Sequence, residues 1–541
     1  MNDRISVRRW GAPLASLALL TTLFPAVAGA RTGGPEVRTE PALEATVPAP
    51  VRIVDGEVLL TLEETVALAL ERNLGLRVER FTRQQIRLGV EQAMGVYDLS
   101  LGGSASVSSD ESPAASNLDG AEVQEQDRGT FGLGVSQLFA SGGTGRIEWG
   151  NGRFKTNSQF AILNPSYSSG IDFSLSQPLL RGFGRSQTEF GIRIAEFQSD
   201  AARATFLQQV STTIQNAENA YWNLVTAQAN LRVAEESLRL AQQLHEDNQI
   251  RVDVGTLAPL ELVQSEAGVA TRQEEIIRAR AAIGDAEDVL RYLIDIRNQA
   301  AWKLPIVAET PAETEPIAID VEQGIETARQ SRPELAAERI NQSSREIESV
   351  YYRQRTRPRL DLTARYGFNG VGGDVVVRDP DGNVISSVPG GWDDAINQML
   401  DADFAGWQVG LEFGYPLQNR SARARAVIAD LALEQGRTVL ERLEQIVEAE
   451  VRIAARGVDT SRQEIESARV SVRFSERNLE AERRKYENGL STSFQILQVE
   501  EDLTAARSRL VNAITGYRRA IVEYDRSIGR LLEHSGVMVV D

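Results

Sequence analysis

SFQILQVEEDLTAARSRLVNAITGY, residues 493–517, is the stretch that decides the fold of this chain. Within it Ile496, Leu503, Leu510 and Tyr517 recur every seven residues, and a second series of Val and Ala lies between them. A seven-residue apolar repeat is typical of a helix that packs in a coiled coil. The stretch therefore predicts a long helix whose small seam residues let a neighbouring helix approach closely.

The same heptad register appears in the first half of the chain, at Leu262, Val269, Ile276, Ile283 and Leu290. No Pro occurs between Pro178 and Pro259, and none follows Pro416. Because Pro breaks a helix interior, these Pro-free regions predict two very long helices, about 185–252 and about 419–487. Each precedes a Gly-containing turn and another helix, ending near 297 and 532. At 1.5 Å per residue, each of the two longest would reach roughly 100 Å.

The chain contains an internal duplication. Residues 62–69 align with 321–328 at an offset of 259, whereas residues 262–266 align with 496–500 at an offset of 234. Repeat proteins have units of roughly 20–50 residues, so a repeat of this length indicates a duplicated domain. We assign the first repeat to 61–300 and the second to 320–534, with a linker at 301–319 and a tail at 535–541.

Strand-like segments separate the helices in each repeat. Residues 171–177, 360–366 and 409–415 alternate apolar and polar side chains, which predicts strands with one apolar face. We place the strands at about 99–177 and about 358–416. The apolar face of such strands meets either another sheet, in a soluble sandwich, or lipid, in a membrane barrel. Acidic segments with Gly and Pro, 110–128 and 372–403, are interpreted as exposed loops.

Composition argues against catalysis. The 541 residues include 58 Lys and Arg against 76 Asp and Glu, a net charge of −18, which disfavours a nucleic-acid partner. There is no Cys, and His245 and His534 are the two His. Thiolate metal sites and Ser-His-Asp catalysis therefore have almost no residues to use. We expect no enzyme, no cofactor and no metal site.

The N-terminus predicts export. Arg4, Arg8 and Arg9 precede an apolar stretch and the small residues at 26–30, so residues 1–30 are interpreted as a signal peptide. Residues 31–60 are interpreted as an extended segment. The strands of one chain are too few to enclose a pore, and open edges in lipid are prohibitive. A barrel shared between several chains is the expected solution.

These features together resemble the TolC-type outer membrane efflux proteins. The resemblance is carried by residues 60–73, by Gln177-Pro-Leu-Leu-Arg-Gly-Phe-Gly184 and by the duplicated turns at 254–256 and 486–489. It implies an α+β membrane protein, internally duplicated. A long coiled-coil helical barrel would join a transmembrane β-barrel of 12 strands shared between three chains, with a belt around the helices. Because 12 strands allow two in each half, we expect the additional segments 130–139 and 145–154 to form a hairpin extension.

The resemblance also implies a periplasmic gate and adaptor-contacting turns. We assign the turns to Val254, Gly255, Thr256, Asn488, Gly489 and Leu490. We assign the gate to Glu261, Tyr486, Gln495 and Gln498, with the Tyr hydroxyl donating to the carboxylate. The best-known member of the family has an Arg at the position of Ser491 and Asp at those of the two Gln, so its Arg-based latch is absent here. Packing of Tyr486 in a heptad seam is an equal alternative.

The function implied is a passive exit duct of a tripartite efflux or type I secretion system. It would be a homotrimer in outer membrane lipid, with its helical part in the periplasm. Its partners would be a periplasmic adaptor and an inner membrane pump or ABC transporter. The alternatives are a soluble periplasmic coiled-coil scaffold, or an adaptor protein, which normally has one helical hairpin where this chain has two.

Overall fold

The computed structural model describes residues 44–45, 52–114, 120–297, 302–312, 315–379 and 384–538. The expected signal peptide, residues 1–30, lies outside these ranges. Each repeat opens with two helices where one was expected: α1 (Leu62–Arg72) and α2 (Leu74–Met94), then α7 (Val321–Ser331) and α8 (Pro333–Gln354). Asn73 ends α1 and caps α2 by accepting the Leu76 N–H, and Pro333 begins α8.

Two long helical hairpins follow, as predicted. Short α3 (Arg185–Thr188) precedes α4 (Phe190–Asp253), which turns into α5 (Pro259–Leu293). In the second repeat α10 (Arg420–Glu487) turns into α11 (Ser493–Ser527). The helices α4 and α10 contain 64 and 68 residues, which corresponds to about 100 Å each. The predicted seam residues Ile496, Leu503 and Tyr517 are buried.

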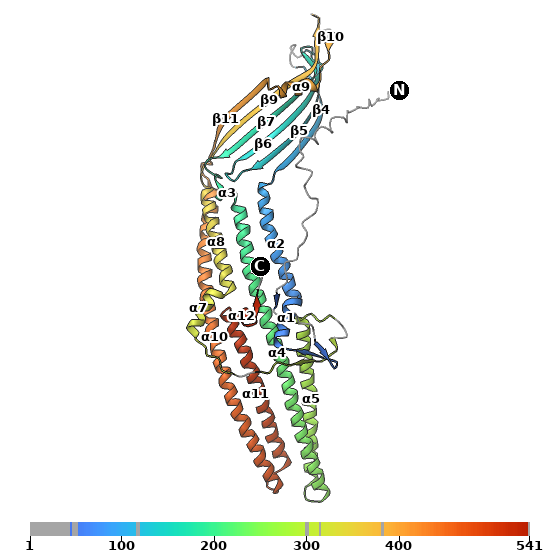
Figure 1. Cartoon of the computed structure of the whole chain (residues 1–541), viewed down its shortest axis with the longest axis vertical. Helices are drawn as coiled ribbons and strands as arrows, with labels where there is room; N and C mark the ends of the chain where they lie inside the picture. The colour runs from blue at the N-terminus through green and yellow to red at the C-terminus, as the bar shows by residue number, and fades with distance from the viewer. Residues whose placement is uncertain are drawn as a thin grey trace, which may run out of the picture. The chain divides into compact units, whose positions relative to one another are not determined.

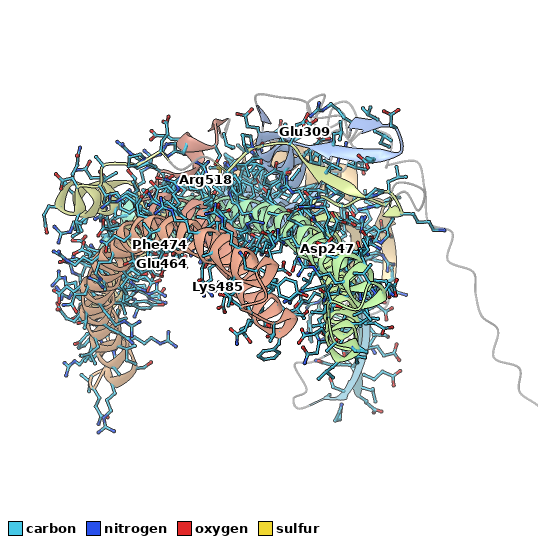
Figure 2. The ribbon with its side chains drawn as sticks, turned by 90° about the horizontal axis from the view of Figure 1, so that it is seen from below. Asp247, Glu309, Glu464, Phe474, Lys485 and Arg518 are labelled. Atoms are coloured by element: carbon cyan, nitrogen blue, oxygen red, sulfur yellow. The ribbon has the colours of Figure 1, made fainter. Side chains whose placement is uncertain are left out.

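Four helices pack side by side in the part next to the sheet, and four pack side by side in the part next to the hairpin turns. Next to the sheet, α2 packs on α4, α4 on α8 and α8 on α10. Towards the turns the order is α5, α4, α11, α10, so α4 and α11 join the two hairpins. Seen end-on, the helices lie side by side along an arc (Figure 2).

A small group of strands, which we call the belt, lies against the middle of the helices. Strands β2 (Arg52–Val54) and β3 (Glu57–Leu60) pair antiparallel, and β3 pairs parallel with β8 (Ile306–Ala308). Thus the last residues of the expected extended segment, 31–60, and part of the expected linker, 301–319, form one sheet. The C-terminal tail, after α12 (Leu531–His534), contributes β12 (Val537–Met538), which pairs with β1 (Glu44–Ala45).

All of the long strands belong to one sheet, at the end of the helices opposite the hairpin turns (Figure 1). Their order is β4, β5, β6, β7, β9, β11, and the bounds are β4 (Ser100–Pro113), β5 (Val123–Leu138), β6 (Thr144–Thr156), β7 (Leu163–Pro178), β9 (Arg359–Arg378) and β11 (Phe404–Gly414). Strand β4 follows the short helix η2 (Gly95–Tyr97). The segments 130–139 and 145–154 were expected as a separate hairpin extension, but they lie within the one sheet: β5 and β6 pair with each other and with β4 and β7 on their outer sides.

The acidic loops are also shorter than expected. Strands β4 and β5 run into 110–128 and leave residues 114–122 between them. In 372–403, β9 continues to Arg378 and pairs with β10 (Val384–Val388), and α9 (Trp392–Leu400) packs on β9 and β7. Added Cβ atoms at Gly370 and Gly372 would collide with the α9 backbone, so glycine allows this close approach. Alternation alone did not indicate this contact.

Candidate functional site

The two hairpin turns have the same backbone geometry. After α4, the Thr256 N–H donates to the Arg251 carbonyl at 2.8 Å, and after α10 the Leu490 N–H donates to the Lys485 carbonyl at 2.9 Å. The residue between, Gly255 or Gly489, has φ of +78° or +73°. This is a Schellman turn, in which the left-handed residue favours glycine. The duplication therefore extends to the hydrogen bonds that reverse each hairpin.

All six predicted turn residues are exposed. Among them, Val254 and Leu490 are 67% and 78% exposed, and Leu260 and Phe494 present further apolar surface on the helices that follow. Exposed apolar residues gathered at one end of a molecule are typical of a surface that meets a partner.

A buried polar cluster joins the hairpins one turn above these tips. It consists of Asn248 on α4, Glu261 on α5, Tyr486 on α10 and Ser493 on α11; we call it the tip cluster. The Tyr486 hydroxyl donates to Asn248 Oδ1 and lies 3.1 Å from Ser493 Oγ. Asn248 Nδ2 donates to the same Ser493 Oγ at 2.8 Å. Asn248 and Ser493 are fully buried, so these groups have exchanged water for each other.

Glu261 enters the tip cluster through its carboxylate. Its Oε2 accepts the Ser493 backbone N–H at 2.7 Å, at the first residue of α11. A helix start has unpaired N–H groups and a partial positive charge, so a carboxylate there is stabilising. The structure thus brings Glu261 and Tyr486 into one cluster, although their side chains bond to Ser493 and Asn248 and not to each other as expected.

One cation, Arg251, contacts the tip cluster, and an ion pair lies beside it on α10. The Arg251 guanidinium lies 4.9 Å from the Tyr486 ring centre, and its Nη1 donates to the Tyr486 carbonyl at 3.4 Å. On α10, Glu482 accepts from Lys485 at 2.8 Å and from the Ser491 hydroxyl. These two hydrogen bonds lower the pKa of Glu482, so the carboxylate stays ionised. Ser491 thus meets an acidic partner within its own hairpin. Figure 2 labels Asp247 and Lys485, which directly precede Asn248 and Tyr486 in the sequence.

The other two predicted gate residues lie apart from the cluster. Gln495 and Gln498 are exposed on α11. Sequence reasoning missed Asn248, although a signal was present: it continues the heptad series of Ala234 and Ala241. A single Asn at a seam position is known to specify how helices pair.

The sheet carries a second candidate site, because its two faces differ along every strand. One row of directly opposed residues crosses all six strands and is apolar throughout; we call it the wall row: Leu101, Val135, Ile147, Phe173, Tyr366 and Trp407. The adjacent row, on the other face, is polar throughout: Ser100, Ser136, Arg146, Ser174, Arg365 and Gln408. An apolar face against a polar one is the pattern of a membrane strand between lipid and water.

The belt holds a buried carboxyl group. Glu218 on α4 accepts from the Ser535 hydroxyl at 3.2 Å, and burial raises the pKa of this carboxyl to about 7. Nearby, burial also raises the pKa of Asp525, while His534 lies 2.9 Å from its carboxylate. The C-terminal end of the chain is thus joined to α4 through the Glu218 carboxyl and to α11 through the Asp525 carboxyl, and burial raises the pKa of both groups.

Within the described ranges, no group of His, Asp and Glu side chains is arranged to hold a metal ion. In those same ranges, no helix is both long enough and apolar enough to cross a membrane.

This chain is similar to known proteins in both sequence pattern and fold. The family model of outer membrane efflux proteins matches residues 65–294 and 324–530. The fold is similar to those of the outer membrane channels OprN (16% identity, TM-score 0.63, 86% of this chain and 89% of that one) and CmeC of Campylobacter jejuni (17%, 0.62, 87% and 86%). The open state of MtrE from Neisseria gonorrhoeae is also similar (16%, 0.58, 87% and 89%). No curated protein sequence matches.

Proposed function

The chain belongs to the outer membrane efflux protein family, and from this membership we propose that three copies assemble into a passive exit duct. The protein is an outer membrane channel for efflux, with its helical part in the periplasm. The duct itself would carry out no chemistry. A periplasmic adaptor and an inner membrane pump or ABC transporter would supply cargo and energy.

The two unpaired edges of the sheet are the observation that supports assembly of several copies. Among the described residues, β4 pairs with β5 alone and β11 with β9 alone, so each end of the sheet leaves a row of unpaired N–H and C=O groups. In lipid each unpaired group costs several kcal/mol. The wall row supports a lipid location for this sheet, and closure with further copies removes both edges. Three copies are what the family resemblance implies.

A soluble scaffold is the alternative, and assembly separates the two. We would measure the detergent-corrected protein mass of the complex extracted from outer membranes, and then its conductance in planar bilayers. About three chains per particle and discrete conductance steps would support the duct. A monomer or dimer that leaves the membrane without detergent would contradict it.

We propose further that the tip cluster is the gate. Its contacts hold α4 against α10 and α11 at the end farthest from the sheet, so separating the hairpins there requires breaking buried hydrogen bonds. Gln495 and Gln498, exposed on α11, would line the entrance between tips. Opening would then be driven by whatever binds the tips more strongly when they are apart.

The exposed turns are proposed as the adaptor contact. Val254, Thr256 and Leu490 carry side chains into solvent, and Gly255, Asn488 and Gly489 shape the reversals. Single cysteines at Thr256 and Asn488, in a chain without natural Cys, would test this by crosslinking in cells. Adducts of the mass of an adaptor are expected at both turns. A cysteine at exposed Glu246, on the side of α4, is the control that should give none.

A further inference from the structure

The strand count of one chain has a consequence for the barrel. Six strands span the sheet: β10 pairs only with the end of β9 farthest from the helices, Val375–Arg378, and does not continue along it. Three copies would therefore contribute eighteen strands, not the twelve that the resemblance implies. We infer that β5 and β6 are wall strands of an eighteen-stranded barrel shared by three chains, which encloses a wider pore. This inference rests on the proposed trimer.

The apolar and polar faces of the sheet continue without a break across β5 and β6. On β5 and β6, Val135 and Ile147 lie in the wall row, and Ser136 and Arg146 lie in the polar row beside it. A hairpin lying outside the membrane has no reason to follow the alternation of its neighbours. Since a shift of one residue would reverse the faces, the matching register indicates that all six strands meet the same lipid and the same water.

The apolar face of the sheet has the height expected of a band that lies in lipid. On β9 it runs from Leu360 to Phe368, and on β11 from Ala405 to Phe413. Nine residues at 3.4 Å, tilted by about 40°, give a band of about 20–25 Å, which is the height of the apolar band of an outer membrane barrel. Trp149 and Leu133 continue this band on β6 and β5, opposite Ile171.

The additional hairpin, β5 and β6, is also attached to the sheet at its helix-side end. The turn between β5 and β6 is bonded to the end of β7, where Gln177 Nε2 donates to the Ser141 carbonyl at 3.1 Å and Ser141 Oγ donates to Gln177 Oε1 at 2.7 Å. It is also bonded to the segment that joins β7 to α3, where the Gly184 N–H donates to the Ser141 carbonyl at 2.9 Å. Both ends of the family motif at 177–184 thus hold this turn at the rim of the sheet.

The circumference of the barrel can be compared with that of the ring of helices to which it is joined. Strands 4.8 Å apart and tilted by about 40° occupy about 6.3 Å of circumference each, so eighteen give about 113 Å and twelve about 75 Å. Four helices abreast in each of three chains make twelve, and helices 8–10 Å apart give about 96–120 Å. An eighteen-stranded barrel matches this helical ring. Its backbone diameter would be about 36 Å, against about 24 Å for twelve strands.

The edges also have the polarity that closure requires. Strand β4 runs away from α2 and β11 runs towards α10, so the two edges point in opposite directions. The edge of one copy can therefore pair antiparallel with that of the next, as every other pair in the wall does. The partner of each edge is thus a second copy of this chain.

Single cysteines and a membrane-impermeant maleimide test the inference in intact outer membranes. On β6, Ile147→Cys and Arg146→Cys sample the two faces. On β7, Phe173→Cys and Ser174→Cys lie directly opposite and are the matched controls, because β7 belongs to the wall in either barrel. The maleimide reacts with the thiolate form of cysteine, and a lipid environment suppresses ionisation of the thiol. Arg146→Cys and Ser174→Cys should therefore be labelled at least about tenfold faster than Ile147→Cys and Phe173→Cys.

The outcomes separate the inference from the function on which it rests. A β6 pattern that matches β7 supports eighteen strands. Fast labelling at both β6 positions, with the β7 pattern kept, overturns the inference and leaves the duct intact. If Phe173→Cys and Ser174→Cys on β7 also label equally fast, the result would contradict the proposed membrane barrel itself. An electron cryomicroscopy map of the complex in nanodiscs, which needs no variant, should show a wall about 36 Å across; about 24 Å would overturn the inference.

Discussion

Replacing Tyr486 by Phe should loosen the gate. The change removes one hydroxyl and keeps the ring on which Arg251 lies. Asn248 Oδ1, in a fully buried side chain, loses the donor that now satisfies it. A buried acceptor left without a donor costs about 1–3 kcal/mol. If this cost falls on the joined state of the hairpins, the equilibrium moves about 5–150-fold towards separated tips.

The assay is the conductance of the reconstituted channel in planar bilayers, together with hydrogen exchange of the peptides around 486–493. We expect longer and more frequent open events and faster exchange at the tips. Tyr517→Phe is the matched control: this buried Tyr also makes two hydrogen bonds, to the Glu315 carbonyl and from the Ile317 N–H, but in the belt. It should lower stability without changing conductance. Faster exchange in Tyr486→Phe with unchanged conductance would refute the gating role and leave packing as its sole role.

Three further results are expected. Burial raises the pKa of Glu218 to about 7 from 4.5, so the stabilisation from its protonated form is complete below pH 4.5 and is lost as the pH rises through 7. The free energy of unfolding of the wild type, measured relative to Glu218→Gln, should be about 3 kcal/mol higher at pH 4.5 than at pH 8, and an equal pH dependence in both chains would contradict this. At the turn, Gly489→Ala, forced to φ +73°, should destabilise the tip by about 1–2 kcal/mol in hydrogen exchange, whereas Gly457→Ala, inside α10 with open space around it, should stabilise by about 0.5–1 kcal/mol; equal effects would argue against turn strain. Leu490→Glu should reduce adaptor crosslinking at the tips at least about tenfold if its exposed apolar surface is part of that contact, and unchanged crosslinking would exclude it.

Much of the candidate site could be anticipated, but not its bonding. The family resemblance predicts Tyr486 and Glu261 as gate residues, and the structure places both in the tip cluster. Their partners were not selected, because the contacts cross from one hairpin to the other. Asn248 and Ser493 are 245 positions apart, and nothing local in either segment indicates that one side chain faces the other.

The sequence by itself determined the elements that depend on local periodicity. Heptads without Pro predicted the four long helices, Gly at the two reversals predicted the turns, and alternation predicted two-faced strands, because each signal lies within one segment. Tertiary structure alone decided how the segments pair. The alternation in residues 130–154 fits a hairpin outside the barrel and a pair of wall strands equally well, because both structures place every second side chain on the same face. Only the register of β5 against β4 and of β6 against β7 distinguishes them, and register is a relation between strands that no single strand contains.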